Sequence, residues 1–178
     1  MIGLRPEPDQ CEAAPALRRI LEAPSEQAFV VAQLGQSLDG RIATVTGDSR
    51  FINGEAALTH LHALRACVDA VVVGIGTVLA DDPLLTVRRV NGRNPARVVI
   101  DPRGRLPLTG KWLSDDAPCL VVSPLKPKLS HVEHLEVSAP DGQLDPHEIV
   151  SALFARGFHR ILIEGGARTI SNFIDADC

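Results

Sequence analysis

"DAVVVGIGTVLADDPLLTVR", residues 69–88, is the stretch that decides how the whole chain is interpreted. It begins with a run of four apolar residues, 70–73, which predicts a buried strand. The fifteen residues that follow, 74–88, contain two glycines, two threonines, two adjacent aspartates, a proline and an arginine. We expect a flexible turn there, but this composition is richer than a plain connection needs. The sequence therefore predicts a binding site directly after a buried strand.

Short apolar runs recur along the chain and alternate with helical patterns. Strands are predicted at residues 28–34, 69–74, 96–101, 119–123, 134–137 and 160–166, and helices at 16–23, 53–68, 146–156 and 167–176. Continuous apolar strands separated by helices are typical of a largely parallel sheet that is covered on both faces. We therefore predict a three-layer α/β/α fold, in which ligands bind at the carboxyl ends of the strands.

Two of the helices carry recognisable start signals. Asn53 is predicted to be an N-cap, with Glu55 in the first turn of its helix. Asp145 is predicted to cap another helix, which has Pro146 at its first position and ends at Gly157.

Length and composition fit one globular domain of 178 residues, with 45% hydrophobic residues and a net charge of −4. Because the basic residues are scattered, we expect no nucleic-acid partner. No apolar run approaches the roughly 20 residues that span a bilayer, and the N-terminus has no signal-segment pattern, so we expect a cytoplasmic protein without a membrane partner. The proline-rich residues 1–26 are interpreted as an N-terminal extension and residues 27–178 as the domain.

Several common kinds of site are disfavoured by spacing. The four cysteines lie far apart, and no histidine has neighbours at metal-ligand spacing, so we expect neither a disulfide framework nor a bound metal. A dinucleotide-binding fingerprint is incomplete, because Leu79 stands where a third small residue is required after Gly76.

Three groups of polar residues remain as candidates. Asp81 and Asp82 are suited to proton transfer or orientation, although Asp-Pro is also a routine turn signal. Arg88 is suited to holding a phosphate, or is simply a surface charge. Glu164 precedes a glycine pair and a helix, which is an arrangement that binds ligands or merely allows close packing. We expect the Glu164 carboxylate to accept hydrogen bonds from a neutral polar ligand, because it would repel phosphate.

The motifs as a set resemble the RibD C-terminal family of riboflavin biosynthesis. They are "QSLDGRIA", "GDSRFIN", "HALRACVDAVVVGIGTVLADDPLLTVR", "ARVVID" and "IEGG", in this order. The resemblance implies a dihydrofolate-reductase-like fold and an NADPH-dependent reduction of 5-amino-6-(5-phosphoribosylamino)uracil to the ribitylamino compound. In that reaction hydride passes to C1 of the sugar, which opens as an imine.

The resemblance also implies roles for individual residues. Implied substrate contacts are Ser49, Arg65, Leu85, Arg88 and Glu164, and implied cofactor contacts are Gln36, Phe51, Gly76, Thr77, Asp81, Gly166, Ala167, Arg168 and Thr169. Asp81 is the implied catalytic residue, because it would orient the reacting end of the cofactor. The resemblance further implies a homodimer.

The sequence departs from the family pattern in three places. Gln33 stands where relatives often have lysine, and Pro102 where some have a serine near the cofactor phosphate, which leaves Arg103 or Arg105 as candidates for the 2′-phosphate. The chain also ends at Cys178, before the usual C-terminal strands. We therefore expect an unpaired edge on the strand at 160–166, self-association, and weak catalysis by these residues alone. The alternatives are a reductase of another pterin-like or ribosyl-pyrimidine substrate, and a non-catalytic ligand-binding or assembly module.

Overall fold

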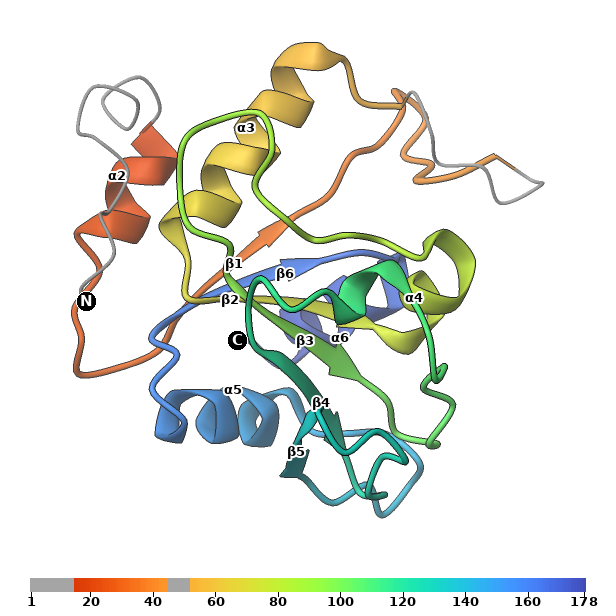
Figure 1. The fold of residues 1–178 in the computed structure, drawn as a ribbon. Coiled ribbons are helices and arrows are strands. Elements are labelled where there is room, and N and C mark those ends of the chain that lie inside the picture. Colours follow the sequence, from red (N-terminus) through yellow and green to blue (C-terminus); the bar gives the residue numbers. More distant parts are fainter. Residues whose placement is uncertain (1–14, 45–51) are drawn as a thin grey trace.

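The computed structural model describes residues 15–44 and 52–178 (Figure 1). Two predicted site residues, Ser49 and Phe51, lie outside this part of the chain, as does the start of the predicted N-terminal extension.

A parallel sheet of six strands forms the centre of the described residues, in the order β1-β6-β2-β3-β4-β5. The strands are β1 (Phe29–Gln33), β2 (Ala70–Gly74), β3 (Ala96–Ile100), β4 (Cys119–Ser123), β5 (Glu133–Glu136) and β6 (Arg160–Glu164). The predicted unpaired edge on the strand at 160–166 is wrong, because β6 pairs with β1 on one side and with β2 on the other. Its apolar residues Ile161, Leu162 and Ile163 are fully buried, as a central strand requires.

Helices cover both faces of this sheet, so the predicted three-layer α/β/α architecture is confirmed (Figure 1). One layer holds α2 (Pro15–Leu21), α3 (Glu55–Cys67) and α4 (Ile75–Asp81), and the other holds α5 (Pro146–Ala155) and α6 (Ala167–Asp175). Strand β2 shows how the sheet serves both layers. Val71 and Val73 pack in the first layer's core, whereas Ala70 and Val72 pack in the second. All four are 0% exposed, and burying one valine side chain contributes about 1.5–3 kcal/mol.

The helix start at Asp145 is confirmed, and the one at Asn53 is wrong by one residue. The Asp145 side chain accepts a hydrogen bond from the His147 backbone N–H at 2.8 Å, and Pro146 opens α5. Helix α3 begins at Glu55 with Gly54 as its N-cap. The Asn53 side chain lies against Gly35 instead, so closely that a Cβ on Gly35 would clash with it. Asn53 therefore joins two segments near the sheet rather than capping the helix.

Residues 74–88 are also more regular than the predicted flexible turn. Helix α4 begins directly after β2, with Gly74 as its N-cap, and ends at Asp81. The reason is that Ile75 and Val78 are apolar at helical spacing, and both are buried against the sheet.

The helical part of the predicted extension is packed on the domain. Leu17 and Ile20 of α2 are 3% and 1% exposed and belong to the same core as α3. A separate finding is that none of the helices in the described part of the chain is long and apolar enough to cross a membrane.

Candidate functional site

A cavity of about 700 Å³ opens at the carboxyl ends of four neighbouring strands. Gln33 of β1, Glu164 of β6, Gly74 of β2 and Ile100 of β3 all line it. This is the edge at which parallel α/β sheets bind their ligands, and the volume falls within the range of small-molecule sites. The cavity is therefore the candidate active site.

A buried ion pair joins α3 to the end of β6 at the cavity wall. Arg65 Nε and Nη2 each donate to one carboxylate oxygen of Glu164, both at 2.7 Å. Both residues are 7% exposed, so water weakens this bidentate pair little. The prediction that Glu164 accepts hydrogen bonds from a neutral ligand stays a prediction, because Arg65 takes one acceptor site on each oxygen and a carboxylate offers about four.

The beginnings of α4 and α6 meet at the next part of the wall. Gly166, the N-cap of α6, donates its backbone N–H to Thr77 Oγ1 at 3.3 Å. Gly165 has a φ of 115°, and a Cβ there would lie 2.7 Å from the same hydroxyl. Only glycine fits this approach without strain. The glycine pair therefore brings the α6 N-terminus, with its partial positive charge, to the cavity.

The segment after α4 is held in an unusual backbone conformation. Leu85 is 2% exposed and lines the cavity with a φ of 55°, a value that non-glycine residues adopt at a cost of about 1–3 kcal/mol. The next residue, Thr86, accepts a hydrogen bond from Arg65 Nη1 at its carbonyl oxygen, over 3.1 Å. The Thr86 hydroxyl accepts one from Arg88 Nη1 at 2.7 Å. Partial desolvation of the Arg88 guanidinium, together with nearby Arg65 and Arg89, lowers its pKa.

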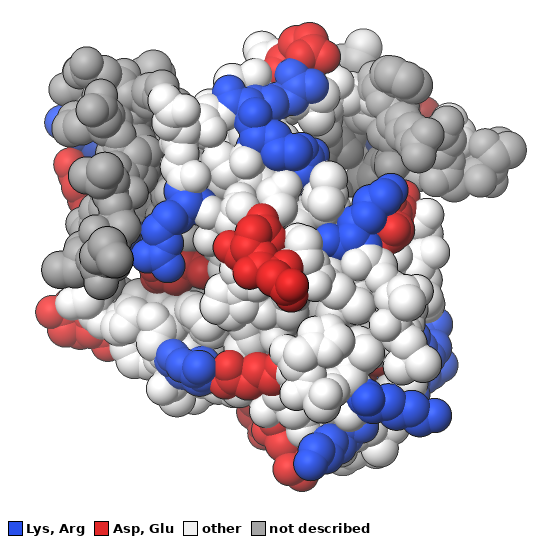
Figure 2. Space-filling model, viewed as in Figure 1, with Lys and Arg blue, Asp and Glu red and all other residues white. Residues whose placement is uncertain are grey.

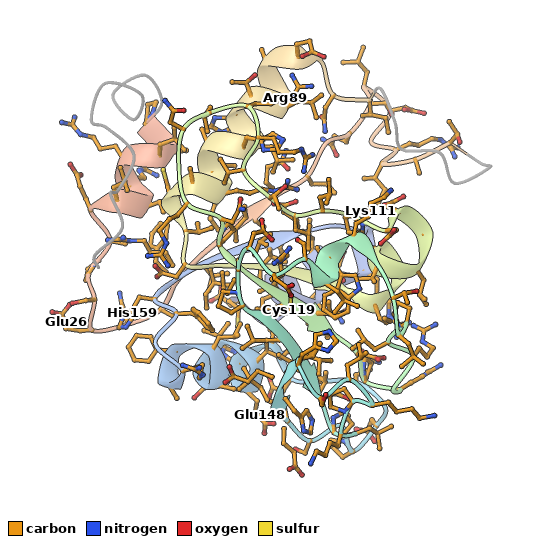
Figure 3. All side chains as sticks on the ribbon, viewed as in Figure 1. Glu26, Arg89, Lys111, Cys119, Glu148 and His159 are labelled. Carbon is orange, nitrogen blue, oxygen red and sulfur yellow. The ribbon has the colours of Figure 1, made fainter. Side chains whose placement is uncertain are left out.

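The two adjacent aspartates have separate environments. Asp81 lines the cavity from the last turn of α4. Asp82 has a φ of 41°, forms the C-cap, and accepts the Lys111 backbone N–H at 2.7 Å. Figure 3 shows Lys111 beside α4. Asp82 therefore anchors a loop, and Asp81 faces the candidate site.

A second loop brings two more cations to the cavity. Arg103 and Arg105 both line it from the segment after β3. The carboxylate of Asp101, 1% exposed, accepts the backbone N–H of Leu106 at 2.8 Å and fixes this loop.

The structure brings most of the predicted site residues together. The cavity is lined by Arg65, Gly76, Thr77, Asp81, Leu85, Glu164, Gly166, Arg168 and Thr169. Three predicted residues of the described chain, Gln36, Ala167 and Arg88, are exposed and lie outside this lining set. Arg88 is linked to the cavity wall through Thr86, which in turn accepts a hydrogen bond from Arg65.

Sequence reasoning missed the turn before α5. The cavity is also lined by Gly142, Gln143 and Leu144, which lie between β5 and α5. These residues follow no strand end that carries a motif. The Asp141-Gly142 turn next to the Asp145 cap was the only signal available. Among the described residues, no group of three or more histidine, cysteine, aspartate or glutamate side chains is placed to hold a metal ion.

Comparisons with known proteins agree with this geometry. The 2,5-diamino-6-ribosylamino-4(3H)-pyrimidinone 5′-phosphate reductase of Methanothermobacter thermautotrophicus is 42% identical over 147 residues, which are 78% of this chain and 68% of that protein. The protein of the same name from Archaeoglobus fulgidus is 38% identical, over 82% of this chain and 74% of its own length.

The solved structures show the fold. The deaminase/reductase of Thermotoga maritima matches with a TM-score of 0.75 and 33% identity, over 84% of this chain and 42% of that one. This chain therefore spans about two fifths of that two-activity relative. The fold it shares with these reductases is dihydrofolate-reductase-like. The model of the RibD C-terminal domain matches residues 28–178, and the chain belongs to this family.

Proposed function

We propose that the protein is an NADPH-dependent reductase of a 6-ribosylaminopyrimidine 5′-phosphate in riboflavin biosynthesis. The observation that carries the proposal is a cavity in which the α6 N-terminus, Arg103 and Arg105 lie on the same site as the Arg65–Glu164 pair. Its volume and its location at the strand ends suit a nucleotide cofactor beside a sugar phosphate. The names of the relatives at 42% and 38% identity support the reaction.

On the cofactor side, this chain supplies positive charge and close backbone approach. The N-terminus of α6 is suited to the pyrophosphate, since backbone N–H groups and the helix dipole both favour an anion. Arg103 and Arg105 are suited to the 2′-phosphate that distinguishes NADPH from NADH. The bound nicotinamide would supply the hydride, and Asp81 would orient its ring from α4.

On the substrate side, the proposed contacts are Arg65, Leu85, Arg88 and Glu164. Glu164 would act mainly by fixing Arg65, whose three hydrogen bonds to Glu164 and Thr86 leave it little freedom. Arg88 at the edge would bind the 5′-phosphate through its planar guanidinium. Most of the work assigned to these residues is alignment and electrostatics.

Two substrates differ only at C2 of the pyrimidine. The sequence resemblance implies the uracil, which carries an oxo group there, whereas the relatives at 42% and 38% identity are named for the 2,5-diamino compound. The names of these relatives favour the diamino compound as a second candidate substrate. Purified protein given each substrate with NADPH decides between them, with the ribitylamino product measured directly.

Binding of NADPH without turnover of either substrate would contradict the proposal and favour a ligand-binding module. We also propose that the protein is a cytoplasmic homodimer. Its mass in solution tests the dimer, and a monomer mass would contradict it.

A further inference from the structure

We propose that His62, a histidine with no assigned role, is a positioning residue that aims Arg88 at the substrate phosphate. The inference rests on the proposed function, because it takes Arg88 as the phosphate contact. Its physical basis is a direct contact. The Arg88 backbone N–H donates to His62 Nδ1 at 3.0 Å.

The location of His62 shows that this contact is built into the fold. His62 lies on α3, one turn before Arg65, and is 3% exposed. Residues at positions i and i+3 of a helix share a face. Helix α3 therefore presents two side chains to the segment after α4, with Arg65 holding the Thr86 carbonyl and His62 holding the Arg88 N–H.

Every residue of the segment 85–88 is held by a different group. Leu85 is buried, and the Val87 backbone N–H donates to Asn94 Oδ1 at 2.7 Å. Thr86 and Arg88 are held by α3, as described above. This amount of restraint keeps the left-handed conformation of Leu85 in place. The Arg88 guanidinium, which donates to the Thr86 hydroxyl, extends from an otherwise fixed segment.

The role requires His62 to be neutral, because Nδ1 must offer a lone pair. Burial is the main cause that lowers the pKa of His62 to about 4, and the charges of Arg65, Arg88 and Arg89 lower it further. The Thr86 backbone acts in the opposite direction. His62 therefore stays an acceptor near neutral pH and adds no further charge to this arginine cluster.

The cluster carries more positive charge than its carboxylates balance. Glu164 neutralises Arg65, and the exposed Glu55 pairs with Arg89, whereas the Arg88 guanidinium donates to the Thr86 hydroxyl and pairs with no carboxylate among the described residues. Figure 2 shows basic side chains gathered over the region of α3, where Figure 3 labels Arg89. An unbalanced guanidinium on a fixed segment is suited to an anion that arrives with the substrate.

The test is a double-substitution cycle with His62→Phe and Arg88→Ala. Phenylalanine keeps a ring but removes the acceptor. We expect His62→Phe to raise KM for the phosphorylated substrate roughly tenfold, since it leaves the Arg88 N–H unpaired. The kcat, the Kd for NADPH and the KM for the substrate without its 5′-phosphate should change less than about twofold. In the Arg88→Ala background, His62→Phe should have no further effect on KM.

Two further variants keep the test sharp. His62→Asn retains an acceptor near the position of Nδ1 and should restore most of the affinity. His60→Phe changes a histidine on the same helix, outside the cavity lining, and should leave all constants unchanged. An equal rise in KM for the substrate with and without its 5′-phosphate would overturn the inference. So would effects of His62→Phe and Arg88→Ala on KM that simply add.

Ring ¹⁵N NMR of the wild-type protein tests the same contact without any substitution at His62. We expect an unprotonated Nδ1 at neutral pH whose resonance moves when ribose 5-phosphate is added, and no such movement in Arg88→Ala. A protonated Nδ1, or a resonance indifferent to ribose 5-phosphate, would overturn the role of His62. This readout needs no turnover, whereas absent turnover of both pyrimidine substrates would count against the proposed function alone.

Discussion

Two buried arginines, Arg65 and Arg97, show how the same side chain serves different ends in this fold. Arg65 is 7% exposed at the cavity and pairs with Glu164, which is equally buried. Arg97 is fully buried on β3, away from the cavity lining, and pairs at 2.9 Å with Asp116, whose side chain is 41% exposed. Its other contacts are the Ser114 hydroxyl and the carbonyls of Ser114 and Ala117.

The difference lies in what each guanidinium holds. Arg97 fastens the loop before β4, and its partner Asp116 keeps contact with water. Arg65 and Glu164 have lost nearly all contact with water, and they fix the segment that carries Leu85 and Arg88. Burying both partners of an ion pair is costly, so it is expected where geometry matters more than stability. The comparison predicts that the Arg65–Glu164 pair matters for activity as well as stability, and Arg97 for stability alone.

The largest effect is expected from Glu164→Gln. It leaves the Arg65 charge buried without a countercharge, which costs about 3–5 kcal/mol of unfolding free energy. Chemical denaturation measures this change. The matched control, Arg65→Met with Glu164→Leu, removes both charges and should recover much of the stability while activity stays low. Recovery of full activity in the control would show that the pair is only structural.

Arg97→Met is expected to cost about 2–4 kcal/mol of unfolding free energy, because several buried acceptors lose their donor. The cost should stay below that of Glu164→Gln, because Asp116 remains solvated. KM and kcat of the folded fraction should match the wild type. A raised substrate KM at unchanged stability would reverse the comparison.

Arg88→Ala is expected to weaken substrate binding by roughly 1.5–3 kcal/mol, the range for a charge-assisted hydrogen bond. Affinity for NADPH and thermal stability should stay near the wild-type values. Steady-state kinetics with varied substrate and, separately, varied NADPH measure this. An unchanged substrate KM would mean that Arg88 is a surface charge.

The last prediction concerns pH and His62. Its pKa is about 4 in the folded protein, below the ordinary value of 6.5, so between these values the unfolded chain binds more protons at this site. Folding stability from this group is therefore lost as pH falls from 6.5 to 4, by at most about 1.4 kcal/mol per pH unit. His62→Asn should flatten that part of the stability profile. Parallel profiles for the two proteins would contradict the assigned pKa.

The layers of the fold were predictable from sequence because they follow from apolar periodicity. Residues 70–73 and 161–163 are continuous apolar runs, and Asp145-Pro146 is a local helix signal. Strand order was not predictable, since pairing β6 between β1 and β2 depends on contacts distant in the chain. This is why the expected free edge was wrong.

The candidate site was predictable to a similar extent. The strand-end motifs located Thr77, Asp81 and Glu164, because a parallel sheet brings such ends together. That Glu164 pairs with Arg65 could not be read from residues 99 positions apart. The hydrogen bond from the Arg88 backbone N–H to His62 was hidden for the same reason, since the two residues come from different segments of the chain.

The most direct test of the central claim is turnover of a 6-ribosylaminopyrimidine 5′-phosphate by the purified protein with NADPH. We predict one ribitylamino product formed for each NADPH oxidised, with a clear preference over NADH that Arg103→Ala combined with Arg105→Ala removes. Failure to oxidise NADPH with either the uracil or the 2,5-diamino substrate, in protein that binds both ligands, would contradict the account.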